Sequence, residues 1–155
     1  MGAQANIYVV IMAGGVGSRF WPRSRERSPK QLMEIVGGRT MIQDAVGRLN
    51  GFVEPEKIFV VTNKLQKHTV IKQLPDIPVE NIIIEPVGRN TAPCIGLAAM
   101  FVHRLDPDGV MVILPSDHIV RDEKEFRRVL GVGVDAAHKH SSLITIGIQP
   151  THPET

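Results

Sequence analysis

Short runs of β-branched and other apolar residues alternate with longer amphipathic stretches along the chain, and this alternation constrains its fold more than any other feature. The apolar runs cover residues 7–12, 58–62, 82–84, 110–114 and 143–148. Uninterrupted runs of this kind are typical of strands buried on both faces of a sheet. Helical spacing of apolar residues predicts helices over 40–49, 64–74, 91–105 and 123–140. Thr91 is the expected N-cap of the third helix, and Asp122 or Arg121 leads into the fourth.

Strands and helices that alternate in this way predict an α/β fold. We expect three αβα layers, with a Rossmann-like, mostly parallel sheet covered by helices on both faces. The 155 residues suffice for one domain with a hydrophobic core. Ligands of such sheets bind where the strands end at their carboxyl side. The residues directly after each apolar run are therefore the candidates for function.

The composition excludes several classes of partner. The chain is 43% hydrophobic and 22% charged, and its net charge of +2 does not indicate a nucleic-acid binder. The apolar runs are too short to cross a membrane, and no basic region precedes the first one. Cys94 is the single cysteine, which indicates a reducing compartment, and its apolar neighbours predict a buried small side chain. We therefore expect a cytoplasmic protein with no membrane partner.

The first apolar run is followed by a loop rich in glycine, residues 13–19, with the sequence AGGVGSR. Glycines allow backbone N–H groups to approach a ligand closely, and phosphate oxygens are the usual partners. Two common phosphate loops do not fit. A Walker A loop that starts at Gly14 requires glycine at Arg19, and a dinucleotide fingerprint through Gly15 and Gly17 requires glycine at Phe20.

The loop continues with a cluster of basic residues between two prolines, Pro22 and Pro29. The prolines restrict the loop, and the large apolar side chains of Phe20 and Trp21 can anchor it. We expect Arg19 and Lys30 to face a ligand phosphate. The remaining arginines are expected on the loop surface: Arg23, Arg25 and Arg27.

Two further strand ends carry polar residues. The run 110–114 is followed by Pro115, Ser116, Asp117 and His118, and a carboxylate in the position of Asp117 is suitably placed to bind Mg²⁺. A turn or capping role for Asp117 is the alternative. The run 82–84 is followed by residues 85–91, EPVGRNT, which lead into a predicted helix start, where polar groups of a ligand can bind.

These three strand ends together resemble the sugar-1-phosphate nucleotidyltransferases. The family signature Gly-Gly-x-Gly-x-Arg-(apolar)-x-Pro, followed by Pro-Lys, matches the glycine-rich loop through Lys30. The segments FWP, PKQ, EPVGRNTAP and LPSDH are similar to those of mannose-1-phosphate guanylyltransferases, also called GDP-mannose pyrophosphorylases. The resemblance extends from residue 7 to residue 155.

The resemblance implies that GTP and mannose 1-phosphate give GDP-mannose and pyrophosphate, with Mg²⁺ as cofactor. Arg19 and Lys30 would be the catalytic residues, and Asp117 would bind the metal. The nucleotide would contact the glycine-rich loop and the third strand end through Ala13, Gly14, Gly15, Gly17, Ser18, Glu85, Gly88, Asn90 and Thr91. Glu85 could accept hydrogen bonds from N1–H and the N2 amino group of guanine.

The family continues well beyond the segment that matches. Residues 1–155 therefore resemble the nucleotide-binding part of a nucleotidyltransferase domain, truncated before its sugar-binding part. We expect this chain to bind nucleotide with little activity. The sugar specificity, assembly into a homo-oligomer and any domain after Thr155 stay open.

Three alternatives are kept. The first is a nucleotidyltransferase for another sugar 1-phosphate; a molybdopterin guanylyltransferase has a shorter loop before its lysine than the Arg19-to-Lys30 segment. The second is a GTP-binding module without chemistry. The third is a dehydrogenase domain, which the missing third glycine disfavours.

Overall fold

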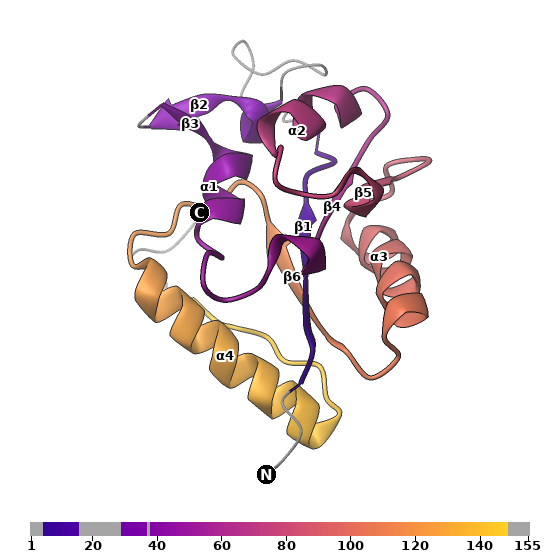
Figure 1. Cartoon of the computed structure of the whole chain (residues 1–155), viewed down its shortest axis with the longest axis vertical. Coiled ribbons are helices and arrows are strands. Elements are labelled where there is room, and N and C mark those ends of the chain that lie inside the picture. Colours follow the sequence, from indigo (N-terminus) through magenta and orange to yellow (C-terminus); the bar gives the residue numbers. More distant parts are fainter. Residues whose placement is uncertain (1–4, 16–28, 37, 149–155) are drawn as a thin grey trace, which may run out of the picture.

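The computed structural model describes residues 5–15, 29–36 and 38–148, except for the side chains of residues 35 and 36 (Figure 1). Its main sheet has four parallel strands in the order β5-β4-β1-β6. Their bounds are Ile7–Met12 for β1, Ile58–Thr62 for β4, Ile82–Ile84 for β5 and Val110–Pro115 for β6. The expected parallel sheet is confirmed.

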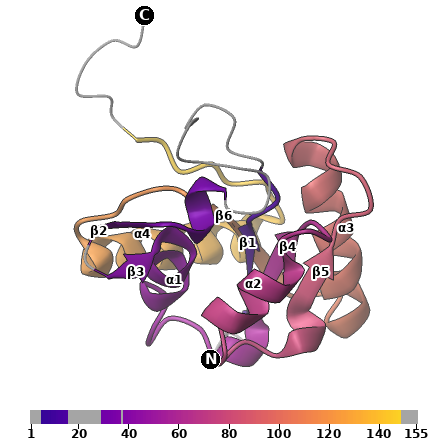
Figure 2. The same cartoon turned by 90° about the horizontal axis from the view of Figure 1, so that it is seen from above.

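The order of the strands creates a switch point between β1 and β6. The chain leaves β1 for its neighbour β4 and then β5, and it returns past β1 to form β6. The helices α1 (Met41–Gly47) and α2 (Lys67–Gln73) precede β4 and β5, and α3 (Thr91–Leu105) precedes β6. Because connections between parallel strands are right-handed, reversing direction across the sheet moves the helix to the opposite face. Figure 2 shows α3 on one side of the sheet, opposite α1.

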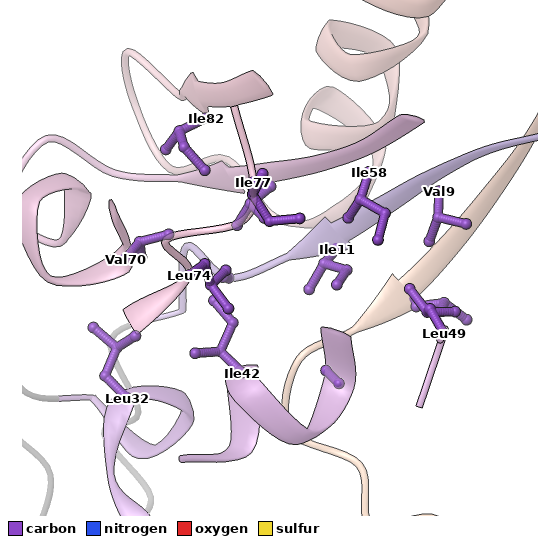
Figure 3. Packing of buried hydrophobic residues seen from close by; sticks show 14 of the residues in the cluster. Val9, Ile11, Leu32, Ile42, Leu49, Ile58, Val70, Leu74, Ile77 and Ile82 are labelled. Atoms are coloured by element: carbon purple, nitrogen blue, oxygen red, sulfur yellow. The ribbon is translucent and has the colours of Figure 1, made fainter. Parts of the chain in front are cut away.

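The core has two halves, one on each face of the sheet. Alternate strand residues such as Val9 and Ile11 pack with side chains of α1, α2 and α4 (Glu123–His140). Figure 3 shows this packing for Ile42 of α1 and Val70 of α2. On the other face, Val10 and Val61 pack against Cys94 and Ala98 of α3. Each fully buried aliphatic side chain contributes about 1.5–3 kcal/mol. The expected burial of Cys94 is confirmed.

The predicted helices are all present. The helices at 91–105 and 123–140 have the expected bounds, and the two shorter ones begin or end a few residues inside their predicted ranges. Asp122 caps α4 by accepting a hydrogen bond from the N–H of Glu125 at 2.9 Å, as expected. The prediction for Thr91 is wrong, because the N-cap of α3 is Asn90, which makes no side-chain capping bond.

The predicted strand at 143–148 is also wrong. This segment forms no strand, and Leu143 is fully exposed. Ile144 and Ile146 lie close to α4, because a Cβ atom added to Gly133 of that helix would be 3.8 and 3.7 Å from them. Its β-branched residues suit a strand, but a strand forms only where a neighbour accepts its backbone hydrogen bonds. Here the segment lies against α4 instead, and the figure shows it beside that helix (Figure 1).

A small antiparallel hairpin, absent from the predictions, lies between β1 and α1. It comprises β2 (Glu34–Val36) and β3 (Arg39–Thr40), and a short 3₁₀ turn at Lys30–Leu32 precedes it. Thr40 and Gln43 form a capping box that starts α1. Within the described part of the chain, no helix is both long and apolar enough to span a membrane.

Candidate functional site

Residues 13–15 continue directly from β1 at the carboxyl end of the sheet. The N–H of Ala13 extends the ladder by donating to the carbonyl of Val61 at 2.8 Å. A Cβ on Gly14 would lie 3.3 Å from Oε2 of Glu85, so a larger residue would crowd this carboxylate. Gly14 thus permits the close approach of Glu85, and the structure brings together two of the three predicted strand ends.

Lys30 and Asp117 meet beside the switch point between β1 and β6. Ser116 fixes the end of β6 against β1, because its Oγ donates to the carbonyl of Met12 at 2.8 Å and its N–H does so at 3.3 Å. Asp117 follows, and its Oδ2 lies 3.9 Å from Nζ of Lys30 in the 3₁₀ turn. The two side chains are 25% and 48% exposed, with Lys30 the less exposed, so this ion pair remains accessible to a ligand.

The third predicted strand end forms an exposed turn before α3. The N–H of Glu85 donates to the carbonyl of Thr62 at 2.8 Å, which holds the partly buried Glu85 beside β4. Gly88, Asn90 and Thr91 follow in the open turn, all exposed. Asn90 has φ 67° and ψ −163°, a conformation that side chains rarely adopt. Strained residues of this kind cluster at binding sites, which makes Asn90 a candidate for ligand contact.

A buried polar network beneath the glycine-rich loop was not predicted. Gln31 donates to the carbonyls of Ala13 and Gly15 at 3.1 and 2.8 Å, and Gln66 donates to the carbonyl of Gly15 at 3.3 Å. Gln31 is the last residue of the PKQ segment that carries the family resemblance, and this is the signal that could have identified it. Gln66 lies among ordinary surface residues in the sequence, and nothing there distinguishes it.

The buried Arg48, directly after α1, forms a hydrogen bond with the loop that follows Asp117. Nη2 of Arg48 donates to the carbonyl of His118 at 2.8 Å, and its guanidinium lies over the ring of Phe126, 5.9 Å from the centroid. Burial lowers the pKa of Arg48, an effect that the carboxylates of Asp44 and Glu123 oppose. The position of Asp117 therefore depends in part on a residue that no motif contains.

Several predicted residues lie outside the described part of the chain. These are Gly17, Ser18 and Arg19 of the proposed site and Phe20, Trp21, Pro22, Arg23, Arg25 and Arg27 of the basic loop. Of the twelve-residue set predicted to bind nucleotide or metal or to act in catalysis, nine are described. They are Ala13, Gly14, Gly15, Lys30, Glu85, Gly88, Asn90, Thr91 and Asp117.

An open hollow of about 700 Å³ lies next to the ends of β4 and β5. It is lined by Lys64, Leu65, Lys67, His68 and Ile84 and contains none of the predicted site residues. The described residues include no group of three or more His, Cys, Asp or Glu side chains that could hold a metal ion. A metal at Asp117 would need ligands from a substrate or from elsewhere.

Comparison with known proteins gives consistent matches over nearly the whole chain. The chain is 45% identical to a mannose-1-phosphate guanylyltransferase of Escherichia coli K12 over 157 residues, which covers 99% of this chain and 32% of that protein. It is 39% identical to the xanthan biosynthesis protein XanB of Xanthomonas campestris, covering 97% of this chain and 32% of that protein. The chain therefore spans about a third of the length of these relatives.

A solved structure from Thermus thermophilus, described as a mannose-1-phosphate geranyltransferase, superimposes with a TM-score of 0.76. It is 30% identical, and the match covers 86% of this chain and 39% of that one. The family described as nucleotidyl transferase matches residues 8–155, which include every described site residue. The chain thus belongs to the nucleotidyl transferase family.

Proposed function

We propose that this chain is the nucleotide-binding part of an enzyme that transfers a guanylyl group from GTP to mannose 1-phosphate. The products would be GDP-mannose and pyrophosphate. One observation carries the proposal: Lys30 and Asp117 lie 3.9 Å apart beside the switch point, next to the glycine-rich loop. Ligands of parallel α/β sheets bind at this position. The similarity to mannose-1-phosphate guanylyltransferases supports the choice of base and sugar.

The reaction needs positioning and neutralisation of charge more than a protein nucleophile. A phosphate oxygen of the sugar attacks the α-phosphorus of GTP in line, and the bond from that phosphorus to the β-phosphate bridge breaks. Lys30 would stabilise negative charge near the α-phosphate. By resemblance, Arg19 would hold the β- and γ-phosphates. The N–H groups of Gly14 and Gly15 would donate to phosphate oxygens.

The residues present fit Mg²⁺ as a cofactor shared with the nucleotide. Mg²⁺ in phosphoryl-transfer sites is held by one or two carboxylates together with substrate phosphates. Asp117 offers one partly exposed carboxylate on the correct edge of the sheet. When bound, the ion would neutralise charge on the phosphates.

Glu85 is the proposed determinant of guanine. Its carboxylate can accept hydrogen bonds from N1–H and the N2 amino group, two donors that adenine lacks. Gly14, Gly88, Asn90 and Thr91 would line the surrounding nucleotide surface, since they share its edge of the sheet. Contacts to the sugar are expected mainly from the part of the family that, by resemblance, follows these residues.

Titration with GTP, ATP, UTP and dTTP, each with Mg²⁺, tests the proposal by calorimetry. We expect GTP to bind most tightly and Glu85→Gln to reduce the preference for GTP over ATP by about tenfold. Glu80→Gln, an exposed carboxylate at the opposite end of the sheet, is the matched control and should leave the preference unchanged. Tighter binding of ATP or of NAD by the unmodified chain would overturn the guanylyltransferase assignment.

The alternative is a GTP-binding module without chemistry, favoured by the 32% of the relatives' length that the chain spans. Incubation with GTP, mannose 1-phosphate and Mg²⁺ separates GTP binding from guanylyl transfer. We expect little or no GDP-mannose from these 155 residues. Robust product formation would show that the chain contains a complete catalytic site.

We further propose a cytoplasmic location, in keeping with the single cysteine.

A further inference from the structure

Three polar side chains are buried directly beneath the glycine-rich loop, where apolar residues would pack at lower cost. Gln31, Thr62 and Gln66 are 4%, 0% and 0% exposed. Burying an amide costs several kcal/mol unless its hydrogen bonds are made. Among the described residues, every buried side-chain nitrogen or oxygen has a partner. The network is therefore fully bonded, and its partners reveal what it orients.

Most of these partners are carbonyl oxygens of the loop. The carbonyl of Ala13 accepts from Gln31 at 3.1 Å and from Thr62 at 3.3 Å. The carbonyl of Gly14 accepts from Nδ2 of Asn63 at 3.3 Å. The carbonyl of Gly15 accepts from Gln31 at 2.8 Å and from Gln66 at 3.3 Å. Each carbonyl of residues 13–15 thus accepts at least one hydrogen bond from a side chain.

This arrangement determines where the loop N–H groups point. In a trans peptide the C=O and the following N–H point in opposite directions. The N–H of Gly14 is therefore directed away from Gln31 and Thr62, and the N–H of Gly15 away from Asn63. Within the described ranges, neither of these N–H groups has an acceptor. Two adjacent donors are left for a ligand.

We propose that Gln31 and Asn63 are positioning residues that turn two N–H groups toward phosphate oxygens of a nucleoside triphosphate. Gln31 holds the peptide between Ala13 and Gly14, and Asn63 holds the peptide between Gly14 and Gly15. The inference rests on the proposed function for the ligand, but it concerns the phosphates and not the base. Gln66 links the two: its Oε1 accepts from Gln31 at 3.3 Å, and its backbone N–H donates to Oδ1 of Asn63 at 3.0 Å. Because Gln31 follows Lys30 in one 3₁₀ turn, the same turn sets both the loop and the cation.

Gln31→Met and Asn63→Leu keep the approximate size of the side chains and remove their donors. Each is expected to weaken binding of GTP·Mg²⁺ about tenfold while changing guanosine binding less than twofold. Asn81→Leu is the matched control. Its buried amide donates to the carbonyls of Glu56 and Ile58 at 2.8 and 3.0 Å, but at the opposite end of β4. It should reduce stability without changing the GTP-to-guanosine affinity ratio.

NMR of the ¹⁵N-glycine-labelled, unmodified chain provides a second measurement that needs no variant to fold. Addition of GTP·Mg²⁺ should shift the amide resonances of Gly14 and Gly15 and leave those of the turn residues Gly38 and Gly51 in place. Unchanged Gly14 and Gly15 resonances at saturating GTP, or an unchanged affinity ratio in both Gln31→Met and Asn63→Leu, would overturn the proposal.

The base preference is a separate outcome. If the unmodified chain binds ATP more tightly than GTP, the proposed function fails, and the same variants are then compared with ATP and adenosine. A tenfold loss for ATP without a loss for adenosine would still support the positioning role of Gln31 and Asn63. If no triphosphate binds at all, both proposals fail.

Discussion

The two ends of the parallel sheet use similar polar side chains in opposite ways. At the amino end, four of them bond to one another: Asn6 donates to Asp106 at 2.9 Å, Tyr8 contacts the same carboxylate at 3.4 Å, and Lys57 donates to Asn6 at 3.2 Å. At the carboxyl end, the amides of Gln31 and Gln66 bond to loop carbonyls.

The difference concerns which groups remain for a ligand. The side chains of the amino-end cluster are paired with one another within the fold. At the carboxyl end, the carbonyls of residues 13–15 are occupied, while the N–H groups of Gly14 and Gly15 face away from those side-chain donors. The carboxylate of Glu85 lies close to Gly14. Polar residues therefore indicate a site only where internal bonding leaves groups directed outward.

The largest expected contrast is between two lysines. Lys30→Met should weaken binding of GTP·Mg²⁺ by about 10- to 100-fold, because charge-assisted hydrogen bonds are the strong ones. Lys57→Met removes a lysine from the amino end, where its Nζ lies 5.7 Å from the ring centroid of Tyr8. It should leave the affinity within twofold. Calorimetry measures both, and equal losses would show that only overall charge matters.

The second contrast is between two aspartates. Asp117→Asn should reduce the increase in GTP affinity that Mg²⁺ produces by about tenfold, since an amide is a poorer Mg²⁺ ligand than a carboxylate. The ion pair with Lys30 contributes little to stability, because exposed pairs are worth about 0–1 kcal/mol. Titrations with and without Mg²⁺ measure the effect. Asp106→Asn should keep the full Mg²⁺ effect; the same reduction in that variant would contradict a metal role for Asp117.

The elements that sequence patterns predicted are those whose own residues determine them. Helix α4 combines apolar spacing with a capping Asp122, and both its ends were predicted. The 143–148 segment has the apolar pattern of a strand, but a strand also needs a partner, and no local pattern supplies one. Asn90 and Thr91 are both acceptable caps in sequence, and only the backbone turn at φ 67° decides between them.

The candidate site likewise contains residues that sequence motifs indicate and residues that only the fold brings together. The family motifs contain Gly14, Lys30 and Asp117, whose roles stay predictions. The structure places Lys30 beside Asp117, and the close approach of Glu85 to Gly14 explains one glycine physically. Gln66 could not be predicted, because its partner carbonyl at Gly15 lies in a different segment of the chain. Side-chain amides bond to many backbone groups, and the fold alone selects which.

The third contrast is between two strained positions. Asn90 has φ 67° before α3, and Ser141 has φ 48° after α4. Glycine adopts positive φ without steric cost, so Asn90→Gly and Ser141→Gly should each raise the free energy of unfolding by about 1 kcal/mol. Urea denaturation measures this. Only Asn90→Gly should also weaken GTP binding; if it stabilises the chain and leaves affinity intact, the strain at Asn90 has no role in binding.

The smallest expected effect tests whether Tyr8 and Asp106 of the amino-end cluster interact with each other. Burial, the charge of Asp106 and the hydrogen bond to it raise the pKa of Tyr8 above 10.0. Tyr8 is the single tyrosine, so tyrosinate absorbance reports it alone. Asp106→Asn should lower this pKa toward its ordinary value, leaving the part due to burial. Because the folded-state pKa is raised, the stabilisation is fully present below about pH 10 and is lost as the pH rises through the folded-state value. An unchanged titration in Asp106→Asn would mean that Tyr8 and Asp106 are not coupled, and that the amino end is as open as the carboxyl end.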